Sequence, residues 1–273
     1  PEPGISRSAR PCACTTDVMS AIRCIFVVSA LSGSVDALTT TAAPLVYLGR
    51  GCFWERQYAT YLVELKAFSR NATDFSSRTG YAGGTPSSGS SEVCYNTGDE
   101  RDYTTHGFAE VVQTTLDAGR ASAQMHALAR DFFDSFVGPV GQRLRPDQAG
   151  DRGTPYRSLL GVPGGILSPL YTAFASQNSF NMTLKPGSGS DPDEINTVWI
   201  YDSKHFPFFA AEVYHQAHCD FEMSKGMPYS KTYIANLWNK LQVDGGVYGN
   251  LWKPTGCPEM HEGVGHPGYL CDF

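Results

Sequence analysis

The chain has 273 residues, a net charge of −6 and 41% hydrophobic residues. This acidic balance argues against a general nucleic-acid or membrane-surface binder, so we expect no nucleic-acid partner and no membrane association. The sequence contains no apolar run of the roughly 18 residues that a membrane-spanning helix needs.

The first 43 residues have the character of a leader, and we do not expect them to belong to the fold. From Met19, a short basic segment precedes an apolar run at 24–31, and residues 35–37 form a small-x-small cleavage sequence. This pattern predicts a secretory signal. The Ser, Thr and Arg content also fits an organelle-targeting leader, and a bipartite plastid leader contains the same apolar run. We therefore expect the secretory pathway or a plastid, and the sequence does not choose between them.

A strand is predicted at 45–48 and a helix at 55–66, and Cys52 lies between them. Backbone N–H groups and the positive end of the helix dipole are expected to stabilise a thiolate at this position. The rings of Phe53 and Trp54 follow directly and are expected to form the wall of an apolar pocket. The alternative is that Cys52 is a small buried hydrophobic residue, which is common for a single cysteine.

Three further motifs follow the Gly51-Cys52-Phe53-Trp54 sequence. A glycine-rich turn at 79–86 presents Tyr81, and a Ser/Gly-rich loop leads into Glu92-Val93-Cys94. The third motif, at 148–158, reads Gln-Ala-Gly-Asp-Arg-Gly-Thr-Pro-Tyr-Arg-Ser.

The rest of the chain predicts alternating strands, helices and loops. Apolar patterning and turn residues place these elements as a strand at 110–117, a helix at 122–136, a short helix at 172–181, a loop at 185–193, a strand at 197–201 and a loop-rich tail at 226–273. His205, His215, His218 and Cys219 match no zinc-binding spacing, and we expect no metal.

The four motifs, in this order, resemble those of the A-type peptide methionine sulfoxide reductases over about residues 45–216. The resemblance implies a two-layer α+β sandwich with a ferredoxin-like core and a mixed sheet. It places the catalytic domain at 44–225 and leaves 226–273 as a C-terminal extension.

The resemblance also implies a site and a reaction, the thiol-dependent reduction of methionine-S-sulfoxide to methionine. The implied roles are Cys52 as nucleophile, Glu92 as the acid, Tyr81 and Tyr156 as ligands of the sulfoxide oxygen, Asp151 as a group that positions water or the substrate main chain, and Phe53 and Trp54 as the methyl pocket. Cys52 becomes a sulfenic acid, and a second cysteine condenses with it to a disulfide. The candidates for this resolving cysteine are Cys219, Cys257 and Cys271.

Partners follow from the same resemblance. We expect a monomer that acts on oxidised proteins, peptides or free methionine sulfoxide, needs no cofactor, and is regenerated by a dithiol such as thioredoxin.

The chain departs from the family pattern in ways that keep two other functions open. About half a dozen extra residues follow Cys94, Pro155 replaces a glutamine, 138–140 is Gly-Pro-Val instead of His-Asp-Pro, and the Gly-Tyr-Cys resolving motif is not where it is expected. One alternative is a degenerate relative that binds methionine-rich peptides without turnover. The other is a thiol peroxidase that uses Cys52.

Overall fold

The computed structural model describes residues 42–71, 73–87, 92–146, 148–219, 229–242 and 256–258. Within 229–242, side chains are described only for residues 229–236. The chain divides into two units, Pro1–Thr39 and Thr40–Phe273, and all described residues belong to the second unit. The predicted leader, except for its last two residues, therefore lies outside the described residues.

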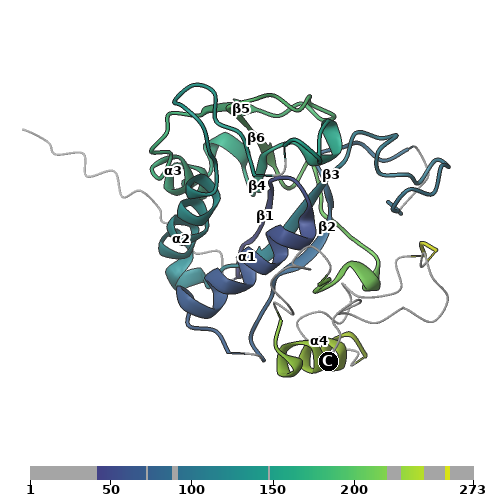
Figure 1. Cartoon of the computed structure of the whole chain (residues 1–273). Coiled ribbons are helices and arrows are strands. Elements are labelled where there is room, and N and C mark those ends of the chain that lie inside the picture. The colour runs from purple at the N-terminus through teal and green to yellow at the C-terminus, as the bar shows by residue number, and fades with distance from the viewer. Residues whose placement is uncertain are drawn as a thin grey trace, which may run out of the picture. The chain divides into compact units, whose positions relative to one another are not determined.

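A single seven-stranded mixed sheet forms the centre of the second unit, in the order β5-β6-β4-β1-β3-β2-β7 (Figure 1). Its strands are β1 Leu45–Gly49, β2 Arg78–Ala82, β3 Ala109–Thr115, β4 Leu159–Val162, β5 Thr183–Pro186, β6 Thr197–Asp202 and β7 Phe209–Ala210. Strands β4, β6 and β5 run parallel, whereas the other neighbours pair antiparallel. The α+β class with a mixed sheet is thereby confirmed.

Three helices lie against one face of this sheet, namely α1 (Phe53–Lys66), α2 (Ala121–Asp134) and α3 (Pro169–Ala175). A fourth helix, α4, spans Lys231–Gln242, and short 3-10 turns include η2 (Thr154–Tyr156), η3 (Gly165–Leu167) and η4 (Val213–His215). In the part of the chain that the structure describes, no helix has the length and apolar character needed to cross a membrane.

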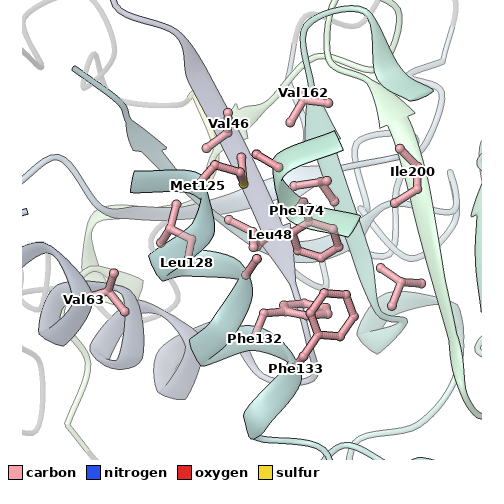
Figure 2. Close-up of a cluster of buried hydrophobic side chains, with 14 of the residues drawn as sticks. Val46, Leu48, Val63, Met125, Leu128, Phe132, Phe133, Val162, Phe174 and Ile200 are labelled. Atoms are coloured by element: carbon pink, nitrogen blue, oxygen red, sulfur yellow. The ribbon is translucent and has the colours of Figure 1, made fainter. Parts of the chain in front are cut away.

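The main core lies between the sheet and the three helices (Figure 2). Successive side chains of a strand point to opposite faces, so Val46 and Leu48 of β1 face the helices and Tyr47 faces the opposite layer. On the helix side, β1 meets Met125 and Phe132 of α2. This packing fixes the start of α1, which directly follows β1.

Phe132 is expected to contribute strongly to stability because it is fully buried among aromatic rings. Its ring centroid lies 5.4 Å from that of Phe174 on α3. Phe132→Ala should lower the free energy of unfolding by about 3–5 kcal/mol, through lost burial and a residual cavity. Urea unfolding measures this loss, and Leu167→Ala, at an 88% exposed residue, is the control. Equal midpoints for the two variants would contradict this description of the core.

Four elements differ from the sequence-based prediction, and one of them is the helix predicted at 172–181, which is α3 and ends at Ala175. Residues 79–82, predicted as part of a turn, belong to β2, and a Cβ on Gly80 would clash with the backbone oxygen of Phe209 in β7. Glycine is thus required there by close strand approach rather than by a turn. The predicted loop at 185–193 begins with part of β5, and the predicted loop-rich tail contains α4.

Candidate active site

Cys52 lies between β1 and α1, as predicted, and the residue as a whole is half-buried. It is the N-cap residue of α1, and its carbonyl accepts the first helical hydrogen bond from the N–H of Arg56 at 3.2 Å. The N–H of the preceding Gly51 donates to the carbonyl of Tyr156 at 3.1 Å. The strand-to-helix junction is therefore joined directly to the turn that carries Tyr156.

The expected lowering of the Cys52 pKa is wrong. Burial raises the pKa of this thiol well above its usual value, and the carboxylates of Glu110 and Asp151 raise it further. The backbone N–H groups of Trp54 and Glu55 lower the pKa, as the helix position predicts, but burial outweighs them. The resting cysteine is thus a protonated thiol.

Glu110 on β3 is the carboxyl group that the structure places against the start of α1. It is 2% exposed, and its Oε2 accepts a hydrogen bond from the N–H of Phe53 at 2.9 Å. Its Oε1 accepts a hydrogen bond from the hydroxyl of Tyr103 at 3.3 Å. Burial raises the pKa of Glu110 to about 8, so the group carries a proton at neutral pH.

Glu92, the acid predicted from the sequence, lies in a different environment. Its side chain is 36% exposed and forms an ion pair with Arg101 at 3.4 Å. The carboxylates that act on the Cys52 thiol are those of Glu110 and Asp151. The structure thus offers Glu110, and not Glu92, as the buried carboxyl group that the chemistry requires.

Asp151 and Tyr156 lie close enough to Cys52 to interact electrostatically with it. Asp151 raises the pKa of Cys52 and of Glu110. Burial raises the pKa of Tyr156, and the charges of Glu110, Asp151 and Cys52 raise it further. Despite Pro155, η2 brings Tyr156 to the site as a neutral hydroxyl group.

Tyr81 on β2 is fully buried, and its hydroxyl donates to Oε2 of Glu212 at 2.8 Å. The other oxygen of Glu212 accepts from the N–H of Tyr95 at 2.8 Å. Tyr81 thus packs in the same buried cluster as Phe53, and its hydroxyl is hydrogen-bonded to the carboxylate of Glu212.

Two histidines hold the aromatic wall beside Cys52. The indole Nε1 of Trp54 donates to Nδ1 of His215 at 3.0 Å, and the indole ring stacks on His218 with centroids 3.7 Å apart. Phe53 packs against His215 with centroids 4.8 Å apart. Burial lowers the pKa of His215 well below its usual value, so this ring stays neutral and can accept the indole N–H.

The described cysteines other than Cys52 are all oxidised. Cys94 and Cys257 form a disulfide, and Cys219 is also disulfide-bonded. Among the candidate resolving residues, Cys219 and Cys257 therefore have other partners in this state, and Cys271 lies outside the described residues.

Sequence reasoning missed Glu110, Tyr103 and Glu212. Glu110 had a recognisable signal, because it is a carboxylate inside the apolar strand sequence Ala-Glu-Val-Val and a buried carboxylate there has a raised pKa. Tyr103 reaches the site from the segment that precedes β3, and Glu212 comes from a segment about a hundred residues further along the chain, so periodicity places neither of them there.

Comparisons with known proteins give structural similarities only. No family model matches the chain, and no curated protein matches it. Among solved structures, the chain is similar to methionine sulfoxide reductase A of Corynebacterium diphtheriae, with 18% identity, a TM-score of 0.43, and coverage of 71% of this chain and 80% of that chain. It is also similar to Mxr1 from Saccharomyces cerevisiae in reduced form, with 23% identity, a TM-score of 0.39, and coverage of 71% and 92%. For Mxr1 in an unusual oxidised form, the identity is 22%, the TM-score 0.33, and the coverage 70% and 88%.

Proposed function

We propose that this protein reduces methionine-S-sulfoxide to methionine with Cys52 as the nucleophile. The observation that carries the proposal is a free thiol at a helix N-terminus, flanked by an aromatic wall and facing a buried carboxyl group that is protonated at neutral pH. The order of the sequence motifs supports the same function.

The proposed reaction needs both a nucleophile and an acid. The sulfur of Cys52 attacks the sulfoxide sulfur while Glu110 gives a proton to the sulfoxide oxygen. The attack forms a bond between the two sulfur atoms. The S–O bond of the substrate then breaks and the oxygen is transferred to the Cys52 sulfur, while the S–S bond breaks and leaves its electron pair on the substrate as a thioether, so Cys52 becomes a sulfenic acid. The thiol proton of Cys52 replaces the one that Glu110 gave, so thiol and sulfoxide become sulfenic acid and thioether without net proton change.

Hydroxyl groups are proposed to bind the sulfoxide oxygen before the proton transfer. Tyr156 is the best placed of them, because the charges of Glu110 and Cys52 both act on it and its raised pKa keeps it a neutral donor. Tyr81 joins it if its hydroxyl turns from Glu212 to the substrate. Asp151 is proposed to orient water or the substrate main chain.

The side chains of Phe53 and Trp54 are proposed to hold the substrate methyl group. The centroids of the two rings lie 6.3 Å apart. The orientation of Trp54 is fixed by its hydrogen bond to His215 on η4 and by its stacking on His218. A pocket that is set before binding orients the sulfoxide sulfur towards Cys52 at low entropic cost.

A dithiol, thioredoxin-like reductant is proposed to restore the thiol of Cys52, because the described candidate resolving cysteines are already in disulfides. Oxidised proteins or peptides are the proposed substrates, acted on by a monomer without a bound cofactor. The proposed catalytic domain is 44–225, with 226–273 as an extension.

The protonated state of Glu110 favours sulfoxide over hydroperoxide as substrate. A sulfoxide needs a proton on its oxygen, and a protonated Glu110 supplies one.

The test is to incubate the full chain with dithiothreitol and a peptide that carries either epimer of methionine sulfoxide. We expect loss of the S epimer only, because a fixed methyl pocket and a fixed acid accept one arrangement around the sulfur. Mass spectrometry of the peptide measures the loss, and hydrogen peroxide consumption is followed in parallel. Peroxide consumption with both epimers intact would overturn the proposal in favour of a peroxidase, and no turnover at all would favour a binding protein.

A further inference from the structure

The segment between Cys94 and Glu110 is longer than the sequence resemblance leads one to expect, and it delivers Tyr103 to the proposed acid. Tyr103 is 2% exposed, and its hydroxyl lies 3.3 Å from Oε1 of Glu110. We propose that Tyr103 is a positioning residue that holds the Glu110 carboxyl group for proton transfer. This inference rests on the proposed function, in which Glu110 is the acid.

The backbone of this segment is closed by its own hydrogen bonds. The N–H of Cys94 donates to the carbonyl of Arg101 at 2.7 Å, and the N–H of Tyr103 donates to the carbonyl of Cys94 at 2.9 Å. Further along, the N–H of Phe108 donates to the carbonyl of Tyr103 at 3.0 Å. The position of Tyr103 is therefore defined relative to β3, which begins at Ala109.

The ring of Tyr103 is also held in its orientation. It stacks between Tyr81, at 4.8 Å between centroids, and Tyr95, at 5.5 Å. Stacking on two sides restricts rotation of the ring, so its hydroxyl keeps its direction towards Glu110.

The two hydrogen-bond partners of Glu110 differ in whether they can accept a hydrogen bond from it. The N–H of Phe53 can only donate, and the carbonyl oxygen of a neutral carboxyl group is a better acceptor than its hydroxyl oxygen. This contact therefore favours the acid proton on Oε1, the oxygen beside Tyr103. A hydroxyl group both donates and accepts, so Tyr103 can accept this proton when Glu110 is neutral and donate to Oε1 when Glu110 is ionised. Such a partner holds the carboxyl group both before and after proton transfer.

Several other groups face Glu110, and their effects on its pKa determine in which direction the loss of one of them should shift that pKa. Burial and the charge of Asp151 raise the pKa of Glu110, whereas the bonds from Phe53 and Tyr103 lower it. The thiol of Cys52 and the hydroxyls of Tyr81, Tyr95 and Tyr156 complete the surroundings. Loss of the Tyr103 hydroxyl should thus raise the pKa of Glu110.

Carbon-13 NMR of the full chain labelled at glutamate carboxyl groups tests this directly. The Glu110 signal is identified by its loss in Glu110→Gln, and its titration midpoint is compared between wild type, Tyr103→Phe and Tyr95→Phe. Tyr103→Phe keeps the stacked ring and is expected to raise the midpoint by about 0.5–1 unit. Tyr95→Phe removes a hydroxyl from the neighbouring ring of the same segment and is expected to leave the midpoint unchanged.

Turnover of the S epimer supplies a second readout. Tyr103→Phe is expected to lower kcat about 5- to 10-fold with little change in KM, because it affects the acid and not the methyl pocket. An unchanged midpoint in Tyr103→Phe would overturn the inference even if the protein is a reductase. A raised midpoint in a protein that reduces neither epimer would overturn the reductase function while leaving the contact between Tyr103 and Glu110 intact.

Discussion

Cys52→Ser should abolish sulfoxide reduction, down to the rate that dithiothreitol gives without protein. A serine hydroxyl is close in size to the thiol, but it is a far weaker nucleophile at neutral pH and cannot form a sulfenic acid. Cys52 also has no disulfide partner, so the substitution breaks no cross-link. The expected result is a folded protein without turnover.

Two measurements accompany the rate. The thermal unfolding midpoint of Cys52→Ser should stay close to that of wild type, which separates chemistry from folding. A sulfenic-acid probe should label wild type after a single addition of substrate and should not label the variant. Residual turnover in Cys52→Ser at more than a small fraction of the wild-type rate would show that another cysteine is the nucleophile.

Glu110→Gln should lower kcat by about 10²- to 10⁴-fold, the range that removal of a general acid typically costs. Glutamine preserves the size of the side chain and an oxygen that can accept the N–H of Phe53, so the start of α1 should keep its geometry. What it removes is the ionisable proton, which burial keeps on Glu110 at neutral pH.

Glu92→Gln is the matched control, because it makes the same chemical change at the residue that sequence reasoning favoured. Glu92 forms a partly exposed ion pair with Arg101. Such a pair contributes at most about 1 kcal/mol, so kcat should stay within about fivefold of wild type. The reverse outcome, a large loss in Glu92→Gln and a small one in Glu110→Gln, would restore Glu92 as the acid.

The sequence was most informative where a local pattern coincides with the chemistry. The strand-to-helix junction at Cys52 follows from apolar periodicity, and β1 and α1 form there. The direction of the Cys52 pKa shift did not follow, because burial and the charge of Glu110 depend on segments more than fifty residues away. Local helix-dipole reasoning supplied one contribution of the correct sign, but not the largest one.

The acid was misassigned for a related reason. Glu92 and Glu110 both lie near a motif, and the sequence does not reveal which of them the fold buries. Pairing of β3 with β2 sets Glu110 opposite Tyr81. Long-range placement of this kind, together with the 3-10 turn that carries His215, cannot be read from periodicity.

The Cys94–Cys257 disulfide makes the folding free energy depend on the redox conditions in which the protein works. The bond joins residues 163 positions apart in the chain, and in the chain-entropy account a loop of that length restricts the unfolded state by about 5 kcal/mol. Cys94 is fully buried, but Cys257 is partly exposed, so an attacking thiolate reaches the bond from the side of Cys257. A dithiol that restores Cys52 is therefore also a reagent that can open this long loop. The protein keeps both its catalytic cycle and its full stability only where reduction of Cys52 outpaces reduction of the cross-link.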